Sequence, residues 1–491
     1  MHKSKKLLQA KPVFVILLPI FFVWHGYVEN FDFVPFADAL LLTILYFFVS
    51  LILFLVLLLF YRNSIKAGIT AFLIMSFHFF FGVLHDDLKK IVHNTFLVKY
   101  SFILPVAFIS FILLIILLKR TSRSFIKLTT YLNIVLLLII IIDSGILIGK
   151  LLFQKTEVEI SREFTKCEGC EKPDIYFIIA DEYAGYRELK EVFHYDNSNF
   201  ETELRKRGFH IIDESFSNYN YTPFSLASIL NMEYLHLKDS NRTGNDITYS
   251  YQQIKNSKVI RFFQANGYQF VNYSLFDFKG QPARVRENFL PVKTNLITSQ
   301  TFLSRLERDL WFNLITRFKS KRTLKKFTYS VGENNDHLYQ LTWNLMLQKT
   351  TEPRFIYTHL MMPHYPYYYD KNGNKLPFER LLEGNQVRKD DYIEYLQYSN
   401  KKLMKLIDHI QRSSATPPVI ILMGDHGFRH FTEPLERKYY FMNFTSVYFP
   451  DKNYSSLTDS TSSVNLFREI LNSRFSQQLP LLKDSSLYLR D

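Results

Sequence analysis

The sequence predicts a protein of two parts: a bundle of five membrane-spanning helices, followed by a parallel α/β sandwich outside the membrane. The first 150 or so residues hold five apolar stretches near the length of about 20 residues that crosses a bilayer. After residue 173, apolar stretches of strand length alternate with amphipathic helical stretches. Such alternation is typical of a sheet covered by helices on both faces.

Composition excludes several other classes. The chain has 491 residues, a length that predicts two or three domains. Charged residues make up 21%, and there are only 17 Pro and 16 Gly, which excludes a largely disordered or collagen-like chain. Two Cys exclude a disulfide scaffold. The mean hydropathy of -0.05 resembles that of a soluble protein only because it averages an apolar half with a polar half.

The five apolar stretches cover residues 12–28, 37–61, 67–83, 100–118 and 131–153. The first is the shortest and contains His25, so a signal peptide is the alternative. No small-residue cleavage site follows it, and four further stretches do. We therefore expect an uncleaved span and a membrane domain over residues 1–153.

Lys and Arg predict the orientation of these spans. Basic residues gather before the first span, between the second and third, and between the fourth and fifth, in residues 3–11, 62–66 and 119–127. The N-terminus is therefore expected in the cytoplasm and everything after Phe153 outside it. This distribution explains much of the net charge of +13, so no nucleic-acid partner is predicted.

The polar residues within the spans include Asp38, His78 and Asp143. Such residues are functional candidates. A transporter, however, usually has more spans and interrupted helices, so we expect an anchor in which Asp38 is interfacial and the other two hydrogen-bond between helices.

A polar linker, residues 154–172, separates the halves and contains Cys167 and Cys170. A Cys-x-x-Cys pair is compatible with a redox motif, with part of a zinc site, or with a small disulfide loop. Outside the cytoplasm the disulfide is favoured.

The second half, residues 173–491, begins with a continuous apolar strand at 174–180. Helices at 199–208 and 259–267 each end in Gly and are followed by strands at 209–212 and 268–273. A strand at 354–359, a long amphipathic helix at 390–411 and a strand at 419–423 complete the pattern. The basic stretch 280–332 is interpreted as an insertion or a lid.

Acidic residues and histidines follow three of these strands. Asp181 and Glu182 come after the first, His364 after the strand at 354–359, and Asp425 with His426 after the last. Ligand sites of parallel sheets lie at the carboxyl ends of strands. These side chains suit a divalent metal such as zinc or manganese. Either aspartate alone would more simply cap a helix; the set together favours a metal site.

Thr222 precedes Pro223, which is a favoured first helical residue. An ordinary threonine N-cap is one interpretation. The other is a nucleophile at a helix N-terminus, where backbone N–H groups favour a phosphoryl anion.

These segments resemble, in order, four motifs of the sulfatase-like branch of the alkaline phosphatase superfamily: residues 174–182, 222–231, 359–369 and 423–427. The likeness covers about 173–472 and implies an alkaline-phosphatase-like α/β/α sandwich. A multi-span anchor with an outward catalytic domain is also the plan of lipoteichoic acid synthases and phosphoethanolamine transferases.

The resemblance implies a role for each matching position. The metal ligands would be Asp181, Glu182, Thr222, Asp425 and His426. Thr222 would also be the nucleophile, and His364 would contact the substrate or protonate the leaving group. Weaker substrate-binding candidates are His359 and His430. No Asp-x-x-x-His segment for a second zinc is present, so the resemblance implies one divalent ion: Zn, Mn, Mg or Ca.

One departure bears on the activity. The Cys-x-Pro-Ser-Arg signature of sulfatases is absent, and Thr222 cannot become formylglycine. We therefore expect a metal-dependent transferase or hydrolase of phosphate-type esters in the inner membrane, acting outside the cytoplasm on phospholipid headgroups or envelope glycans. The alternatives are a sulfuric ester hydrolase and a non-catalytic membrane sensor or assembly protein.

Overall fold

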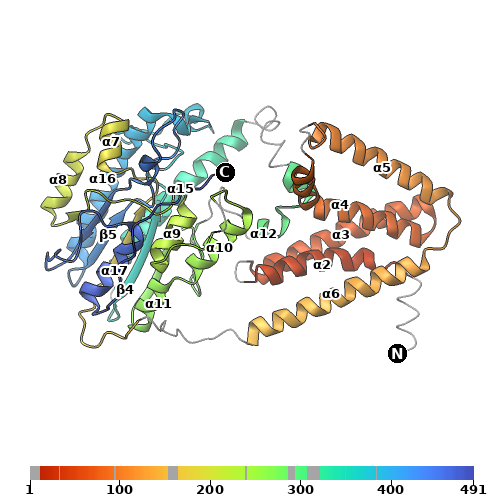
Figure 1. Cartoon of the computed structure of the whole chain (residues 1–491), viewed down its shortest axis with the longest axis horizontal. Coiled ribbons are helices and arrows are strands. Elements are labelled where there is room, and N and C mark those ends of the chain that lie inside the picture. Colours follow the sequence, from red (N-terminus) through yellow and green to blue (C-terminus); the bar gives the residue numbers. More distant parts are fainter. Residues whose placement is uncertain are drawn as a thin grey trace. The chain divides into compact units, whose positions relative to one another are not determined.

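The computed structural model describes residues 11–31, 34–92, 96–152, 164–237, 240–285, 294–306, 321–348, 350–382 and 384–490. The chain forms two compact units. The first comprises Met1–Lys155 with Asn288–Lys319, and the second comprises Thr156–Glu287 with Ser320–Asp491. Figure 1 shows the elements of each unit, which are described separately below.

Long apolar helices build the first unit. They are α2 (Phe14–Glu29), α3 (Phe36–Tyr61), α4 (Ser64–Ile91), α5 (Tyr100–Arg120) and α6 (Ile126–Leu152). Of the described residues, four helices, α3 to α6, are long and apolar enough to cross a membrane. With 16 residues, α2 is shorter. Four long apolar helices are thus present where spans two to five are predicted, and the count of five spans stays a prediction.

Burial divides these helices into two kinds. The residues of α3 and α5 are mostly exposed, although both helices are strongly apolar. In contrast, Phe14, Leu18 and Val28 of α2 are buried, and α2 packs against α3, α4 and α6. Large exposed apolar surfaces on helices fit contact with lipid. The short helix α2 is instead covered by its neighbours.

Polar side chains inside the bundle bond between helices, as predicted for Asp143. Its carboxylate lies 3.2 Å from His25 Nδ1. Asn133 accepts a hydrogen bond from the backbone N–H of Phe14 and donates one to the carbonyl of Lys11. These contacts join α6 to the start and the end of α2.

A segment from the second half of the sequence belongs to the first unit. It contains the short helices α12 (Asn295–Thr298) and α13 (Phe302–Leu306). Gln300 accepts a hydrogen bond from the N–H of Gly82 on α4 at 2.8 Å. The buried Arg305 binds Asp86 of the same helix. This part of the predicted insertion therefore docks on membrane helices, and residues 286–293 and 307–320 lie outside the described residues.

The described residues of the second unit form a six-stranded mixed sheet in the order β2-β6-β5-β1-β4-β3. The strands are β1 (Ile175–Ala180), β2 (His210–Ile211), β3 (Gln269–Tyr273), β4 (Arg354–Leu360), β5 (Val419–Met423) and β6 (Thr445–Tyr448). Strands β5, β1, β4 and β3 are parallel, as predicted. Strand β6 runs antiparallel to both of its neighbours, β5 and β2, so the expectation of a parallel sheet is wrong at β6.

Helices cover both faces of this sheet. The α-helices are α7 (Tyr186–Val192), α8 (Ser198–Lys206), α9 (Thr222–Asn231), α10 (Gly244–Lys255), α11 (Lys258–Ala265), α15 (Lys321–Leu345), α16 (Lys389–Ser413) and α17 (Ser463–Arg474). Short 3-10 helices lie at η2 (Phe378–Leu381), η3 (Asn385–Val387) and η4 (Arg437–Phe441). On one face Thr342 of α15 hydrogen-bonds Thr358 of β4. On the other, Phe263 of α11 and Phe467 of α17 pack on Phe355. The second unit is therefore an α/β/α sandwich.

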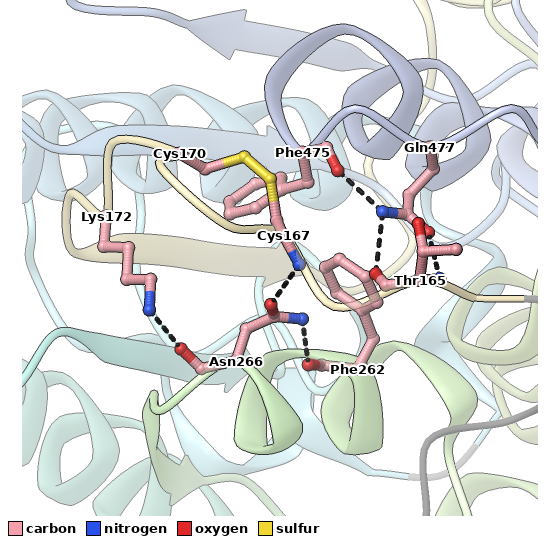
Figure 2. The surroundings of a disulfide bond; sticks show 8 residues. All are labelled: Thr165, Cys167, Cys170, Lys172, Phe262, Asn266, Phe475 and Gln477. Atoms are coloured by element: carbon pink, nitrogen blue, oxygen red, sulfur yellow. Dashed lines mark hydrogen bonds between the residues drawn. A yellow bond between two sulfur atoms is a disulfide. The ribbon is translucent and has the colours of Figure 1, made fainter.

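A disulfide joins Cys167 and Cys170 at the start of the second unit. Figure 2 shows the loop docked on α11, where Asn266 accepts a hydrogen bond from the N–H of Cys167. Lys172 donates to the carbonyl of Asn266, and Gln477 pairs with the backbone of Thr165. Of the three interpretations of the Cys pair, the structure has the disulfide.

Candidate active site

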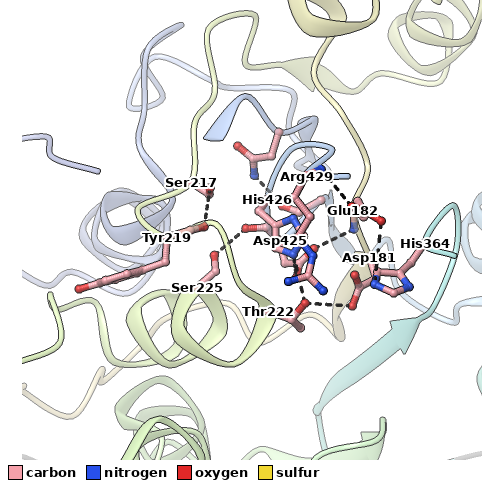
Figure 3. Close-up of polar contacts among 12 residues, drawn as sticks. Asp181, Glu182, Ser217, Tyr219, Thr222, Ser225, His364, Asp425, His426 and Arg429 are labelled. Atoms are coloured by element: carbon pink, nitrogen blue, oxygen red, sulfur yellow. Dashed lines mark hydrogen bonds and ion pairs between the residues drawn. The ribbon is translucent and has the colours of Figure 1, made fainter. Parts of the chain in front are cut away.

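Three neighbouring parallel strands end at the site. Strand β1 lies between β4 and β5, with Ala180 opposite Leu360 and Ile179 opposite Met423. The residues that follow these strands therefore emerge together at one edge of the sheet. Figure 3 shows them facing the first residue of α9.

Asp181 is fully buried directly after β1. Its Oδ2 accepts a hydrogen bond from His359 Nε2 at 2.8 Å, and His359 Nδ1 lies 2.8 Å from the hydroxyl of Tyr357. Burial alone would raise the pKa of Asp181, but His364, His359 and His426 hold this pKa below its usual value. Asp181 is therefore an ionised carboxylate, and the fully buried His359 holds its orientation.

Thr222 is the first residue of α9, and Tyr221 occupies the N-cap position without a side-chain capping bond. The Thr222 hydroxyl instead lies 3.4 Å from Asp181 Oδ2 and 3.2 Å from His426 Nε2. The N-cap interpretation of Thr222 is therefore wrong. The Thr222 side chain projects into the cluster of carboxylate and imidazole groups.

The loop after β5 presents Asp425 and His426, both fully buried. Asp425 Oδ1 accepts a hydrogen bond from the N–H of Glu182 at 2.9 Å, so this carboxylate does not cap a helix. His426 Nδ1 lies 2.7 Å from the carbonyl of Gly427. A carbonyl only accepts, so Nδ1 carries the proton and Nε2 presents a lone pair. That Nε2 lies 3.4 Å from Asp425 Oδ2.

Close backbone contacts explain the two glycines of this loop. A Cβ on Gly424 would lie 2.5 Å from the carbonyl oxygen of Tyr183, and one on Gly427 would lie 2.4 Å from that of Tyr439. Real Cβ atoms do not approach so closely. The glycines thus allow the loop to pack tightly, which places the two side chains between them.

Four of the predicted ligands fit one divalent cation. Three separations link these four ligands: Thr222 Oγ1 to Asp181 Oδ2, Thr222 Oγ1 to His426 Nε2, and His426 Nε2 to Asp425 Oδ2 are each 3.2–3.4 Å. Two ligands of a tetrahedral zinc at its usual bond lengths lie about 3.3 Å apart. Buried atoms Asp181 Oδ1 and Asp425 Oδ2 also have no hydrogen-bond partner. Orphaned carboxylate oxygens of this kind are explained by a bound ion.

Glu182 turns away from this group, in contrast to the expectation that it shares the same metal. Its backbone has a φ of 59°, which is unusual for a residue other than glycine. The carboxylate lies with His364 and His430 in a second set of ligand atoms within 4.8 Å of one another. Burial raises the pKa of Glu182 to about 8, with Arg429 opposing the rise.

Two further groups, which the sequence analysis did not single out, surround the site. The Arg429 guanidinium lies over the ring of Tyr221, with its carbon 4.5 Å from the ring centroid. In Figure 3 this side chain extends toward Thr222. Glu188 is fully buried, its pKa is raised by burial, and it accepts a hydrogen bond from the N–H of Phe428. In the sequence, Arg429 could have been noticed because it stands three residues after His426, whereas no sequence signal indicates Glu188.

The sequence model of the sulfatase family matches residues 189–467, which is more than half of the chain. The match includes Thr222, Asp425 and His426, whereas Asp181 and Glu182 precede it. No curated protein matches the chain.

Several solved structures resemble the chain at low identity. The periplasmic domain of EcEptC from Escherichia coli, in complex with Zn, is 12% identical with a TM-score of 0.41, covering 66% of this chain and 92% of its own. The soluble domain of lipooligosaccharide phosphoethanolamine transferase A from Neisseria meningitidis is 10% identical with a TM-score of 0.39, and the match covers 62% of this chain and 89% of that domain. The phosphonate monoester hydrolase SpPMH from Silicibacter pomeroyi is 15% identical with a TM-score of 0.38, and the match covers 64% of this chain and 75% of that chain.

Proposed function

The chain belongs to the sulfatase family, and from that premise we propose that it is a membrane-anchored, metal-dependent enzyme that transfers or hydrolyses phosphate-type esters outside the cytoplasm. Thr222 is the nucleophile in this proposal. The observation that carries it is the position of the Thr222 hydroxyl, within 3.4 Å of both Asp181 Oδ2 and His426 Nε2. A hydroxyl placed among metal ligands is the arrangement that activates a weak nucleophile.

The metal would be held by Asp181, Thr222, Asp425 and His426. When bound, a divalent cation supplies charge that stabilises the threonine alkoxide and the negative charge of the transition state. The chain's own contribution is to fix the ligands. His359 orients Asp181, and the N–H of Glu182 orients Asp425.

The reaction has two displacements. A bond forms between Thr222 Oγ1 and phosphorus while the bond from phosphorus to the leaving oxygen breaks. The Thr222 hydroxyl gives up its proton in this step, and the leaving oxygen takes one up. An alcohol or water then attacks the phosphothreonine and gives up a proton, and the released Thr222 oxygen regains one. The backbone N–H groups at the start of α9 favour the anionic phosphoryl group during both steps.

We place the leaving group beside His364 and His430, whose ring centroids lie 6.1 Å apart. Burial lowers the pKa of His364, and its Nδ1 contacts the carbonyl of Tyr365. A neutral ring is a poor proton donor, so this environment favours substrate contact over the proton transfer predicted from the sequence.

The apolar helices of the first unit motivate the substrate class. A catalytic unit tethered to a bilayer meets phospholipid headgroups and envelope glycans more often than free metabolites. We therefore propose a headgroup phosphodiester as the donor. Transfer of its phosphoryl group to an acceptor alcohol and its hydrolysis differ only in the second displacement.

The test is the intact mass of the full chain after incubation with phosphatidylethanolamine or phosphatidylglycerol vesicles. We expect an added headgroup phosphoryl mass in the slowed variant His364→Ala. The adduct should disappear when Thr222→Ala is added to that variant. Ser228→Ala is the matched control, since its hydroxyl lies on the same helix and bonds the carbonyl of Glu233. An adduct that survives in the Thr222→Ala background, or is never formed, contradicts the proposal.

Product analysis separates the rival functions. A hydrolase gives the same products with and without an acceptor alcohol, whereas a transferase gives the acceptor ester. Turnover of aryl sulfates but not aryl phosphodiesters would indicate a sulfuric ester hydrolase. A sensor or assembly protein turns over neither.

A further inference from the structure

We propose that Asn220 is a positioning residue for the nucleophile Thr222. It acts through residues 479–490, which we call the strap and which are fastened along the loop before α9. The inference rests on the proposed function, since it concerns the alignment of the Thr222 hydroxyl. It assigns that alignment to residues outside the cluster of carboxylates and imidazoles.

The start of α9 has no capping side chain of its own. Tyr221 occupies the N-cap position without a side-chain bond, and the Thr222 hydroxyl is directed to Asp181 and His426. The entry into a helix is commonly fixed by a side-chain cap. Here the direction in which the chain enters α9, and with it the position of the hydroxyl, depends on contacts from outside the helix.

The strap supplies such contacts through a repeated pair of hydrogen bonds. In each pair an asparagine Nδ2 donates to the carbonyl of a strap leucine, and Oδ1 accepts the N–H of the same leucine, at 2.7–3.1 Å. The pairs are Asn472 with Leu479, Asn465 with Leu482, and Asn220 with Leu489. A side-chain amide offers both a donor and an acceptor, so each pair imitates one hydrogen-bonded pair of an antiparallel ladder.

The third of these pairs lies beside the nucleophile. Asn220 is two residues before Thr222, and both Asn220 and Leu489 are buried. The Leu489 side chain packs with Tyr219 and Phe224 in one apolar cluster. Phe224 belongs to the first turn of α9. The pair and the cluster therefore hold the chain on both sides of Thr222.

The residues just before Leu489 extend this contact along the loop. The N–H of Leu487 donates to the carbonyl of Asn218 at 2.9 Å, and Asn218 Nδ2 donates to the carbonyl of Ser485 at 2.8 Å. The Ser486 hydroxyl donates to the carbonyl of Ser217 at 2.8 Å. The loop before α9 is thus bonded to the strap at several successive residues.

The end of the strap also holds a second segment beside the site. The N–H of Arg490 donates to the carbonyl of Ser240 at 2.8 Å, and the N–H of Arg242 donates to the carbonyl of Arg490 at 3.1 Å. The Arg242 guanidinium lies over the ring of Tyr221. The strap therefore bonds both segments that determine the surroundings of the residue before Thr222.

Misalignment of the nucleophile would be costly. The Thr222 hydroxyl lies 3.2 Å from His426 Nε2 and 3.4 Å from Asp181 Oδ2. Misplacement of a reacting atom by about 1 Å can slow a reaction about 100-fold. Loss of the third pair should therefore lower kcat. It should change KM less, because the proposed substrate contacts, Arg429 and His364, lie on other segments.

The experiment measures kcat and KM for an aryl phosphodiester with the full chain in detergent, well below the Tm of each variant. We expect Asn220→Ala to lower kcat by about 10- to 100-fold with little change in KM. Asn472→Ala is the matched control, because it removes the same two bonds at the other end of the strap. It should keep the wild-type kcat even where its Tm falls. A wild-type kcat in Asn220→Ala, or equal losses in both variants, overturns the proposal.

A double-mutant cycle tests whether Asn220 acts through the strap. A chain that stops after Asp484 lacks Leu489 and keeps the partners of Asn465 and Asn472. We expect Asn220→Ala to cause no further loss of kcat in that chain, because both changes remove the same interaction. Losses that multiply would give Asn220 a role independent of the strap and contradict the proposal.

Hydrogen exchange of the backbone separates this inference from the proposed function. Peptides covering residues 216–226 should exchange faster in Asn220→Ala than in the wild type, and at the wild-type rate in Asn472→Ala. Unchanged exchange in Asn220→Ala overturns the role of the strap whatever the activity. Faster exchange, together with turnover that Thr222→Ala retains, instead contradicts the proposed function and leaves the hold of the strap on the loop in place.

Discussion

Arg429 places a permanent positive charge on the ring of Tyr221, the residue that precedes the proposed nucleophile Thr222. Its guanidinium and that of Arg242 lie over the same ring, Tyr221, at 4.5 and 4.2 Å from the centroid. Arg429 Nε is buried and has no hydrogen-bond partner among the described residues. A planar guanidinium with a buried donor suits recognition of a phosphate or sulfate oxygen.

We therefore predict that Arg429→Ala lowers kcat/KM for an aryl phosphodiester by about 10- to 100-fold, the loss of one charge-assisted hydrogen bond. Arg429→Lys should recover part of the loss, because it keeps the charge but not the planar fork. Steady-state kinetics measure both effects. The control is Arg242→Ala, which removes the other guanidinium from the same ring. Equal losses in the Arg242 and Arg429 variants would indicate a role in holding Tyr221 instead.

Glu201 on α8 makes stability depend on pH. Burial raises its pKa to about 7, with Asp213 adding to the rise. The folded state therefore holds this proton more tightly than the unfolded chain, whose pKa is near 4.5. The stabilisation is complete below about pH 4.5 and is lost as the pH rises through 7.

We expect the Tm of the wild type to fall between pH 5 and 8, and to fall by about 2–4 °C less in Glu201→Gln. Scanning fluorimetry of the full chain in detergent gives the comparison. Glu203→Gln on the same helix is the control, because the pKa of Glu203 is lowered by Lys206 and Arg207. Its carboxylate is ionised throughout this pH range, so the slope should not change. Parallel Tm curves for wild type and Glu201→Gln would rule this account out.

At the scale of elements, the loop after β5 depends on its close packing. Gly427→Ala would place a Cβ 2.4 Å from the carbonyl oxygen of Tyr439 and 2.7 Å from Glu188 Oε2. We predict a destabilisation of about 1–3 kcal/mol, together with a loss of turnover because His426 precedes this glycine. Gly145→Ala on α6 has nothing within 4 Å and should change neither property. Thermal unfolding and turnover of the two variants decide the prediction.

The helix α13 is held to α4 by one buried cation. Arg305 is 3% exposed and binds both Asp86 and Gln300. Arg305→Ala leaves these partners without their donor and should cost about 1–3 kcal/mol. Limited proteolysis of the full chain in detergent should then cut residues 294–306 faster. Arg187→Ala, which breaks an exposed pair with Glu191, is the control. Unchanged cleavage in Arg305→Ala would contradict this role for Arg305.

At the scale of the whole molecule, the apolar helices and the basic loops predict which parts of the chain lie on each side of the membrane. Replacing Cys167 and Cys170 by Ala leaves a chain without Cys, into which single reporters can be placed. We expect Ser455→Cys to react with an impermeant maleimide in intact cells or spheroplasts. Ser122→Cys and Ser4→Cys should react only after the membrane is opened. Labelling of Ser4→Cys from outside would show that α2 does not cross the membrane.

Much of the architecture followed from local pattern. Apolar length indicates α3 to α6, and continuous apolar stretches indicate β1, β4 and β5, because burial on both faces requires an apolar side chain at every position. The side chains after these strands, together with Thr222, were predicted to meet because parallel strands end at one edge. Strand β6 was missed, since its pairing with β5 depends on contacts that no local period reveals.

The sequence by itself determined which residues reach the site, because strand order and motif order place Asp181, Thr222, Asp425 and His426 at one edge. Only the tertiary structure decided which of the neighbouring side chains lie together. Glu182 lies with His364 and His430, and not with Asp181, because its backbone is left-handed and the two histidines come from distant loops. Distant contacts likewise assigned residues 294–306 to the helical unit. Side-chain partners are set by packing between segments far apart in the chain, and the local sequence encodes only burial and period.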